Sequence, residues 1–456
     1  MKDSRTRQAG RLGLLAMLLP LAVTSAAQVD LKWNARVADP AHASQTAALA
    51  GVPATQSRRT SNSPSASPTL DVRAFEAMAE EMVAGGRIPG LAVAIVQNGR
   101  VLSARGYGVT DASRNGLPVD AHTVFRLASL SKSFAGAVTG ILVNDGVLRW
   151  DSKLVDYVPD FRLSQPDAAQ QVTVADLLSH RVGLTRNAFD RDLEGNADFH
   201  TLTNKLASAP MTCAPGQCYA YQNVAFSLIG DIVFATTGQF YSETVTRRIF
   251  KPLGMHDASY GLDGIEASAR WAKPHVRGGG GWVSLMPKPS YYRVAPAAGV
   301  NASISDMAQW LLAQTGHRPD VLPAPLLATL HQSLIDTPSE MRGASWRKTR
   351  LSSAGYALGW RSFEYAGHEV AFHGGAVQGY RGAMALLPDQ DVGIAILWNS
   401  ESALPSGLLP TILDSALGIT GGQWLDEDIT LPATQYVNQD SAAPGSDASA
   451  ASSAPH

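Results

Sequence analysis

The sequence predicts an α/β fold, in which an antiparallel sheet is flanked by helices and carries an inserted, mostly helical lobe. Strand-like segments occur near both ends of the region that can fold, and helix-like segments fill its middle, from about 150 to 290. Strands from the two ends can pair in one sheet, and the middle then forms a second lobe. A functional site is expected in the cleft between the sheet and this lobe.

The N-terminal end of the folded region supplies a helix and a pair of strands. Residues 72–84 form an amphipathic segment, which predicts a helix. Residues 90–96 are an apolar run of strand length, and an Asn-Gly turn signal separates them from a second strand-like run at 101–107. A helical stretch from about 129 to 145 follows.

The C-terminal end shows the same strand signals. Residues 382–387 and 393–397 are apolar runs joined by a Pro-Asp-Gln-Asp turn, and residues 404–417 have a helical pattern. The middle is expected to contain helices joined by polar loops, one of which carries the four glycines of 278–281. These segments supply the second half of the predicted sheet.

The composition divides the chain into four parts. A basic start, an apolar run at 12–23 and small residues after it predict an export signal over 1–27, and the apolar run is shorter than the roughly 20 residues that span a bilayer. Residues 28–69 are polar and predict a disordered linker. The folded domain is expected over 70–432, and a disordered tail over 433–456. We therefore expect a periplasmic or extracellular protein without a stable membrane anchor.

The overall composition excludes several functional classes. Of the 456 residues, 45% are hydrophobic and 17% are charged, and the formal net charge is −2. These values are typical of a globular protein and give no reason to expect a nucleic-acid partner. The histidines are scattered along the chain, so we expect neither a catalytic metal nor a cofactor.

The two cysteines exclude a disulfide-rich scaffold but can form one bond. Export would permit a disulfide. The four residues between Cys213 and Cys218 are Ala-Pro-Gly-Gln, which is a turn sequence. We therefore predict that Cys213 and Cys218 are bonded, with two free thiols as the alternative, and that the bond holds the turn just before Tyr221.

The first candidate element is Ser129-Leu-Ser-Lys132, at the start of an apolar helical run. Side chains three residues apart lie on one face of a helix, so Lys132 can accept the proton of Ser129 if burial keeps part of the lysine neutral. Backbone N–H groups at a helix start can also stabilise an oxyanion. A second Ser-x-x-Lys occurs at 345–348, in a polar stretch with no apolar helix after it. Context therefore favours Ser129 as the nucleophile.

The second candidate element is Tyr221-Gln-Asn223. A tyrosine hydroxyl near a lysine can relay protons, and an asparagine amide can hold a substrate carbonyl. A second Tyr-x-Asn occurs at 436–438, close to the polar tail. Taken alone, either one is more often a packed tyrosine followed by an asparagine in a turn.

The third candidate element is His373-Gly-Gly375, which follows the strand-like residues 369–372. Two glycines let a substrate approach the backbone closely. The backbone N–H of Ala376 can then serve as an oxyanion donor. On its own, a histidine before a glycine turn is more often a core residue.

The three elements together resemble the serine β-lactamase and penicillin-binding protein superfamily, on its class C side. They occur in the order Ser-x-x-Lys, Tyr-x-Asn, His-x-Gly, and the resemblance covers about 70–430. It implies a β-lactamase/transpeptidase-like fold. Further segments that are similar to the superfamily lie at 89–96, 125–132, 174–184, 252–255 and 299–307.

The resemblance implies a role for each candidate residue. Ser129 is the expected nucleophile, and Lys132 is its expected proton acceptor. Tyr221 is the expected general base or proton relay, and Asn223 is expected to orient the substrate amide. The backbone N–H groups of Ser129 and Ala376 are expected to form the oxyanion hole.

The chain departs from the class C pattern at His373, where lysine is usual, and at Gly374, where Thr or Ser is usual. The missing groups help to bind the carboxylate of a β-lactam, so we expect slow or absent cephalosporin turnover. His373 and Gly375 are still expected to bind substrate. An imidazole has a usual pKa of about 6.5, so binding of a carboxylate by His373 should weaken as the pH rises, unless Arg381 contributes.

The sequence thus predicts an exported serine hydrolase that acts through an acyl-enzyme on an amide or ester. The segment 373–380 is more similar to secreted D-Ala-D-Ala peptidases, and esterases and D-amino-acid peptidases share the scaffold. The expected partner is a small-molecule or peptide substrate, such as a cell-wall peptide or a β-lactam, and the protein is expected to be a monomer. Two alternatives stay open: a class C-type β-lactamase, and a penicillin-binding sensor without turnover.

Overall fold

The computed structural model describes residues 69–114 and 116–425. The predicted export signal, nearly all of the predicted linker, the predicted tail and the second Tyr-x-Asn lie outside these residues. Within them, no single helix is long and apolar enough to cross a membrane. The segments Val224–Thr237 and Tyr241–Leu253 reach the required length and composition only together, across a bend of 76°.

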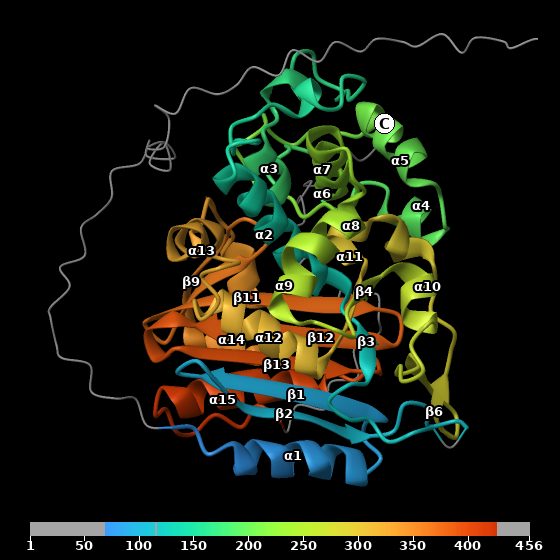
Figure 1. Cartoon of the computed structure of the whole chain (residues 1–456), viewed down its shortest axis with the longest axis vertical. Coiled ribbons are helices and arrows are strands. Elements are labelled where there is room, and N and C mark those ends of the chain that lie inside the picture. The colour runs from blue at the N-terminus through green and yellow to red at the C-terminus, as the bar shows by residue number, and fades with distance from the viewer. Residues whose placement is uncertain (1–68, 115, 426–456) are drawn as a thin grey trace, which may run out of the picture. The chain divides into compact units, whose positions relative to one another are not determined.

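An eight-stranded antiparallel sheet forms the base of the fold (Figure 1). β1 pairs with β13 so that Ala94 lies opposite Ala395, which joins the two ends of the folded region in one sheet. This confirms the predicted fold class. In spatial order the strands are β2 (Arg100–Gly108), β1 (Gly90–Gln97), β13 (Val392–Trp398), β12 (Tyr380–Leu387), β11 (His368–Val377), β10 (Arg361–Tyr365), β9 (Leu351–Tyr356) and β8 (Ile335–Asp336).

The apolar runs of the central strands reflect burial on both faces of the sheet. Every residue of β1 is buried. Its side chains enter two separate cores, with Ala92 and Ala94 on one face and Leu91 and Val93 on the other. A strand buried on both faces shows a continuous apolar run instead of an apolar–polar alternation, as observed at both ends of the sequence.

Helices cover both faces of the sheet. One core contains side chains of α2 (Ser131–Asn144) and α12 (Ile304–Gln314). The other contains side chains of α1 (Val72–Ala84), α14 (Ser345–Arg350) and α15 (Leu408–Ala416). α1 has the predicted bounds, because the carboxylate of its N-cap residue accepts a hydrogen bond from the helix start, and three of its apolar residues are buried.

The middle of the chain forms a lobe of mostly short helices, above the sheet in Figure 1. The helices of the lobe and its neighbours are α3 (Val174–Leu178), α4 (Asp190–Glu194), α5 (Phe199–Lys205), α6 (Val224–Ser227), α7 (Ile229–Thr237), α8 (Tyr241–Val245), α9 (Lys251–Leu253), α10 (Gly261–Glu266), α11 (Ala295–Ala298) and α13 (Ala324–His331). A π-helical turn at Thr246–Phe250 joins α8 to α9.

Two small sheets in this region were not predicted. One contains β3 (Val124–Arg126), β7 (Val300–Ser303) and β4 (Ser259–Tyr260). The other is a hairpin of β5 (His275–Gly278) and β6 (Gly281–Ser284). The four glycines expected in a loop therefore form a hairpin turn, in which Gly281 has a φ of 130° that other residues rarely adopt.

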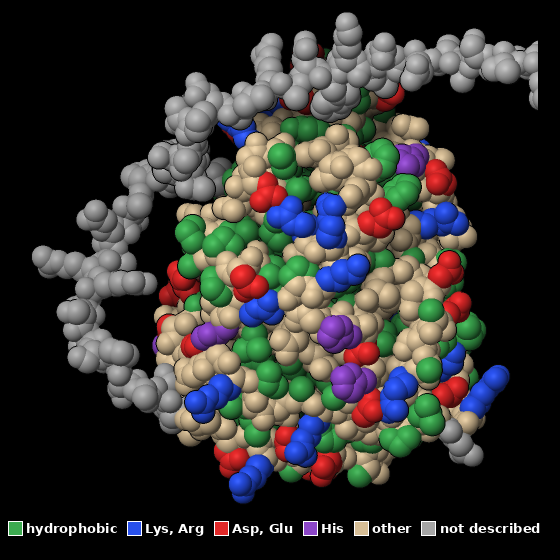
Figure 2. Space-filling view, viewed as in Figure 1, with side chains coloured by type: hydrophobic (Ala, Val, Ile, Leu, Met, Phe, Trp, Pro, Cys, Tyr) green, Lys and Arg blue, Asp and Glu red, His purple; other side chains and the backbone are tan. Residues whose placement is uncertain are grey.

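The surface carries charges of both signs. On the face shown in Figure 2, Lys and Arg side chains are interspersed with Asp and Glu side chains among the described residues. This mixture agrees with the formal net charge of −2 for the whole chain.

Candidate active site

Ser129 lies in a single 3₁₀ turn, η2 (Ala128–Leu130), that leads directly into α2. The turn packs against β11 and β12. A Cβ at Gly375 would overlap the carbonyl oxygen of Leu127, so glycine at this position lets β11 approach the nucleophile turn closely. Ala128, just before Ser129, has a φ of 48°, a left-handed conformation that is uncommon for a non-glycine residue and often occurs at functional sites.

Lys132 lies one helical turn after Ser129 and is fully buried. Its Nζ is 3.5 Å from Ser129 Oγ, 2.7 Å from Asn223 Oδ1 and 3.1 Å from the carbonyl oxygen of Ala297. Burial lowers the pKa of Lys132 well below its usual value; the negative charge of Asp190 opposes this shift and the positive charge of Arg361 adds to it. A lysine with such a pKa can accept a proton near neutral pH.

Tyr221 approaches Ser129 from the helical lobe. Its hydroxyl donates a hydrogen bond of 2.9 Å to Ser129 Oγ. Lys132 Nζ lies 4.6 Å from the centre of the Tyr221 ring. The tyrosine hydroxyl and the lysine amine therefore both contact the serine oxygen: a neutral Lys132 can accept its proton, and Tyr221 can relay it.

Asn223 connects Lys132 to a buried acid. Its Oδ1 accepts from Lys132, and its Nδ2 donates to Asp190 Oδ2 at 2.8 Å. Burial raises the pKa of Asp190 to about 6. Nothing in the local sequence of Asp190 marked it as part of the site, because it lies in a polar segment far from the three motifs.

A chain of hydrogen bonds links the Tyr-x-Asn loop to β11. The backbone N–H of Gln222 donates to His180 Nδ1 at 3.1 Å, and His180 Nε2 lies 3.2 Å from the hydroxyl of Tyr356. This hydroxyl lies 3.0 Å from His373 Nε2, and His373 Nδ1 lies 2.8 Å from the carbonyl oxygen of Gly374. The Gln222 N–H makes His180 Nδ1 an acceptor, so His180 donates from Nε2 to Tyr356, and the carbonyl of Gly374 makes His373 Nδ1 a donor.

The imidazole of His180 is therefore neutral. It accepts at Nδ1 and donates from Nε2, and burial lowers its pKa well below the usual value. The hydroxyl of Tyr356 is in hydrogen-bonding contact with His373 Nε2, and burial raises the pKa of this tyrosine well above its usual value. His373 donates from Nδ1 to the carbonyl oxygen of Gly374.

The position of His373 differs from the one expected of a substrate-binding residue. Its side chain is fully buried, and it is not among the residues that line the cavity at Ser129. The chain of hydrogen bonds holds its ring beneath Tyr356, and the neighbouring residues of β11 face the cavity instead. The expectation of a partly protonated His373 in contact with a carboxylate is not supported by this geometry.

The cavity beside Ser129 has a volume of about 160 Å³. Five of the predicted site residues line it: Ser129, Tyr221, Asn223, Gly375 and Ala376. Four arginines and no acidic residue are among the described residues of its wall. Elsewhere in the described part of the chain, no three His, Cys, Asp or Glu side chains gather in a way that could hold a metal ion.

Arg361 is a further residue of the wall that the motifs did not reveal. Its guanidinium carbon lies 5.6 Å from the centre of the Tyr221 ring, and its Nε is 3.1 Å from Glu340 Oε2. The same carboxylate oxygen binds Arg347 at 2.6 Å, and Glu340 is almost completely buried. One carboxylate shared by two arginines leaves a net positive charge beside the site.

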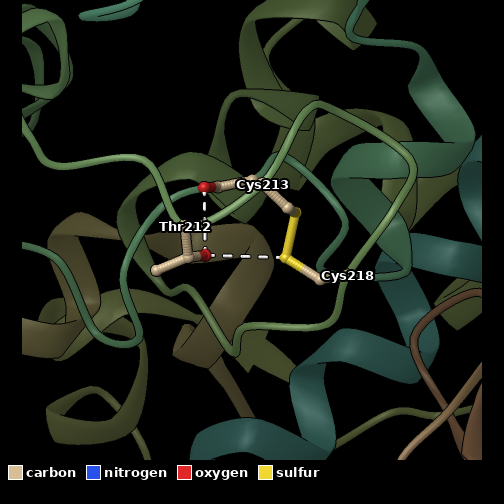
Figure 3. Close-up of a disulfide and its surroundings, with 4 residues drawn as sticks. Thr212, Cys213 and Cys218 are labelled. Atoms are coloured by element: carbon tan, nitrogen blue, oxygen red, sulfur yellow. Dashed lines mark hydrogen bonds between the residues drawn. A yellow bond between two sulfur atoms is a disulfide. The ribbon is translucent and has the colours of Figure 1, made fainter.

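A disulfide between Cys213 and Cys218 is present, as predicted (Figure 3). The turn that it closes is hydrogen-bonded to the lobe, because the N–H of Gly216 donates to the carbonyl of Arg181. The hydroxyl of Thr212 lies 3.5 Å from Cys218 Sγ. Only two residues separate Cys218 from Tyr221, so this cross-linked turn leads directly into the Tyr-x-Asn element.

Comparison with known families assigns the chain. A sequence model described as Beta-lactamase matches residues 75–415. The chain belongs to the Beta-lactamase family. This assignment confirms the resemblance to serine β-lactamases and penicillin-binding proteins, and members of this family are serine hydrolases.

Characterised relatives of this Beta-lactamase family protein are distant. The unguisins hydrolase ungD' of Aspergillus campestris is 27% identical over 339 residues, which are 72% of this chain and 61% of that protein. The chain thus spans about six tenths of the length of this relative. This likeness does not show that the chain shares the activity or the substrate of the relative.

Solved structures share the fold. An octameric penicillin-binding protein homologue from Pyrococcus abyssi superposes with a TM-score of 0.68 and 23% identity, over 79% of each chain. The D-amino acid amidase of Ochrobactrum anthropi SV3 superposes with a TM-score of 0.62 and 21% identity, over 76% of this chain and 98% of the amidase. At these identities the likeness is one of fold.

Proposed function

We propose that the protein hydrolyses an amide or ester through an acyl-enzyme on Ser129. The observation that carries this proposal is the convergence of Tyr221 and Lys132 on Ser129 Oγ, at 2.9 and 3.5 Å. A serine that contacts a base and a proton relay, at the rim of a cavity, is the arrangement that nucleophilic acyl transfer requires. The amidase among the structural neighbours supports the choice of this reaction class.

In the first half of the reaction, Ser129 Oγ attacks the substrate carbonyl carbon. The serine proton passes to the neutral amine of Lys132, directly or through the hydroxyl of Tyr221. The carbonyl oxygen gains the negative charge of the tetrahedral intermediate, and in this proposal the backbone N–H groups of Ser129 and Ala376 bind it. The bond to the amine or alcohol then breaks, and that leaving group takes the proton.

In the second half, a water molecule attacks the ester carbonyl of the acyl-enzyme. Its proton passes to the same base, and the bond between Ser129 Oγ and the acyl carbon breaks as the serine regains a proton. A carboxylic acid is released. Asn223 holds Lys132 in place throughout, because it accepts a hydrogen bond from the lysine. Asp190 in turn fixes Asn223, whose Nδ2 donates to the Asp190 carboxylate.

Labelling with a fluorophosphonate probe tests this proposal. The wild-type protein and a Ser345→Ala variant should be labelled, because Ser345 belongs to the second Ser-x-x-Lys and lies outside the cavity wall. Ser129→Ala should abolish labelling. A mass-spectrometric adduct on any serine other than Ser129 would overturn the assignment.

A class C-type β-lactamase is a second candidate, because the nucleophile is shared. Where that class usually has a lysine and a hydroxyl, this chain has the buried His373 and Gly374, which has no hydroxyl. We therefore propose slow or absent cephalosporin hydrolysis and better activity on peptides or simple esters. Turnover of a chromogenic cephalosporin, a D-Ala-D-Ala peptide and a nitrophenyl ester, together with retention of a fluorescent penicillin, separates hydrolase, β-lactamase and sensor.

We also propose that the protein is exported. The predicted signal over 1–27 and the Cys213–Cys218 disulfide support this, since disulfides persist in oxidising compartments. Expression in a bacterial host with fractionation, followed by N-terminal mass analysis, tests it. A mature chain that begins near residue 28 in the periplasm or medium is expected; an intact chain in the cytoplasm would contradict the proposal.

A further inference from the structure

The cavity at Ser129 extends beyond the catalytic face of the sheet. Part of its wall consists of Trp346, Phe372, Ala383, Trp398 and Leu409. All five belong to the core on the face opposite η2 and α2. We call this part of the cavity, defined by these five side chains, the far-face lobe.

The far-face lobe is reached past the edge of β11. β10 pairs with β11 only from His368 to Phe372. Beyond that point, the described strands leave the β10 side of Gly374–Val377 open, and this segment pairs only with β12. A ligand held by β11 at Ser129 can therefore pass around this edge without crossing the sheet.

Gly374 lies at the opening of this passage. Unlike Gly375, it does not need to be glycine for close packing, because a Cβ there would meet its nearest neighbour, the ring of Phe372, at an ordinary 3.6 Å. Its backbone is also not left-handed. Glycine at this position therefore leaves free space on the face of β11 that points to the far-face lobe.

The charged side chains at the far-face lobe restrict the kind of substrate group that can bind there. Arg347 lies with its guanidinium carbon 5.2 Å from the centre of the Phe372 ring, and Arg381 donates to the carbonyl oxygens of Val377 and Tyr380. Both arginines line the cavity, whose described wall contains no acidic residue. An apolar group fits this environment, whereas a cationic group would meet only like charge.

We propose that the far-face lobe is a subsite for an aromatic group without positive charge on the acyl part of the substrate. A cavity of roughly 150 Å³ lined by apolar side chains holds one benzene-sized ring. The whole cavity here, from Ser129 to the far-face lobe, measures about 160 Å³, so one ring is the largest group that the lobe can take. The inference rests on the proposed acyl transfer at Ser129 and adds the substrate class. The enzyme is then selective for aryl-substituted acyl groups such as 3-phenylpropanoyl.

The acyl group, and not the leaving group, is assigned to the lobe for a chemical reason. The leaving amine or alcohol must receive a proton, so it faces Tyr221 and Lys132. The remainder of the substrate then extends from the carbonyl toward the opposite wall, which includes Gly374 and Ala376. Both residues point to the face of the sheet that carries the lobe, as alternate residues of β11 with Phe372.

A series of p-nitrophenyl esters with one leaving group and different acyl groups tests the subsite. For the wild type, kcat/KM for the 3-phenylpropanoate should exceed that for the acetate by roughly tenfold or more. Gly374→Val, which narrows the passage, and Ala383→Leu, which fills the lobe, should each bring this ratio close to one. An ester with a cationic acyl group, 6-aminohexanoate, should be a poor substrate.

Ala385→Val is the matched control, because Ala385 lies on the same strand and the same face as Ala383 but does not line the cavity. It should keep the wild-type ratio. Fluorophosphonate labelling of each variant reports whether the nucleophile is intact, so loss of labelling points to Ser129 and not to the lobe. The subsite is refuted by a wild-type ratio near one, by a ratio that survives both variants in labelled protein, or by a preference that follows the leaving group.

Discussion

The hydroxyl of Tyr356 lies 3.0 Å from Nε2 of His373, within hydrogen-bonding distance of that nitrogen. Through His180 on its other side, Tyr356 ties the Tyr-x-Asn loop of the helical lobe to the strand that borders the cavity. The position of Tyr221 relative to Gly375 and Ala376 therefore depends on a contact behind the site. This chain of hydrogen bonds stabilises the fold and aligns the two walls of the cavity, one from the Tyr-x-Asn loop and one from β11.

Tyr356→Phe should lower the free energy of unfolding by about 1–3 kcal/mol, because it leaves buried nitrogens of His180 and His373 without their partner. Chemical denaturation at neutral pH measures this loss. Tyr157→Phe is the control: its hydroxyl makes one long bond of 3.4 Å to Ser152 near the surface, and it should change stability by less than about 0.5 kcal/mol. Equal effects of the two variants would argue against the buried chain.

The pKa of Lys132 should depend on two neighbouring charges of opposite sign. It acts as a base when neutral, so kcat/KM should rise with pH through its pKa and level off above it. The Asp190 carboxylate raises that pKa and Arg361 lowers it. Asp190→Asn should therefore shift the acidic limb of the profile to lower pH, and Arg361→Gln should shift it to higher pH.

The two shifts provide their own control, since each variant removes one charge that acts on Lys132, and the two charges have opposite signs. Asp190 itself has a pKa of about 6, so the effect of its substitution should appear above that pH, where the carboxylate is charged. The pH dependence of kcat/KM for a neutral ester is the measurement. If the acidic limb shifts in the same direction in both variants, or does not shift, Lys132 is not the base whose titration the profile reports.

Tyr221 and Lys132 should act as one unit on Ser129. Lys132→Ala and Tyr221→Phe should each slow the reaction by roughly 10²–10⁴-fold, as expected for loss of a proton-transfer group. The double variant should be far less impaired than the product of the two losses, because either change already disrupts the same transfer. Single-turnover acylation rates measure this, and unchanged kinetics of Tyr221→Phe would exclude the tyrosine from the step.

The parts of the fold that local pattern determines could be predicted from the sequence. The bounds of α1, β1 and β2 follow from amphipathic spacing, apolar runs and an Asn-Gly turn. The proximity of Ser129 and Lys132 follows from their spacing on one helix. That strands from the two ends share one sheet followed from the distribution of strand signals along the chain, whereas the specific pairing of β1 with β13 did not.

The parts of the site that depend on long-range packing could not be predicted. Asp190, Glu340 and Arg361 reach the site from separate loops and strands, and no local pattern marks them. The position of His373 depends on Tyr356, which lies on another strand. The far-face lobe depends on where β10 stops pairing with β11, which the apolar runs do not show.

The disulfide should contribute to stability and to the position of Tyr221. It closes a loop with a sequence separation of 5, and a loop this short is expected to add about 2 kcal/mol by restricting the unfolded chain. The double variant Cys213→Ser/Cys218→Ser should lose about that much free energy of unfolding. Because the turn leads into Tyr221, the acylation rate of this double variant should fall as well. A fluorophosphonate should still label its Ser129. Thiol counting on denatured, unreduced wild-type protein is the necessary companion measurement: no reactive thiol is expected, and two would refute the bond.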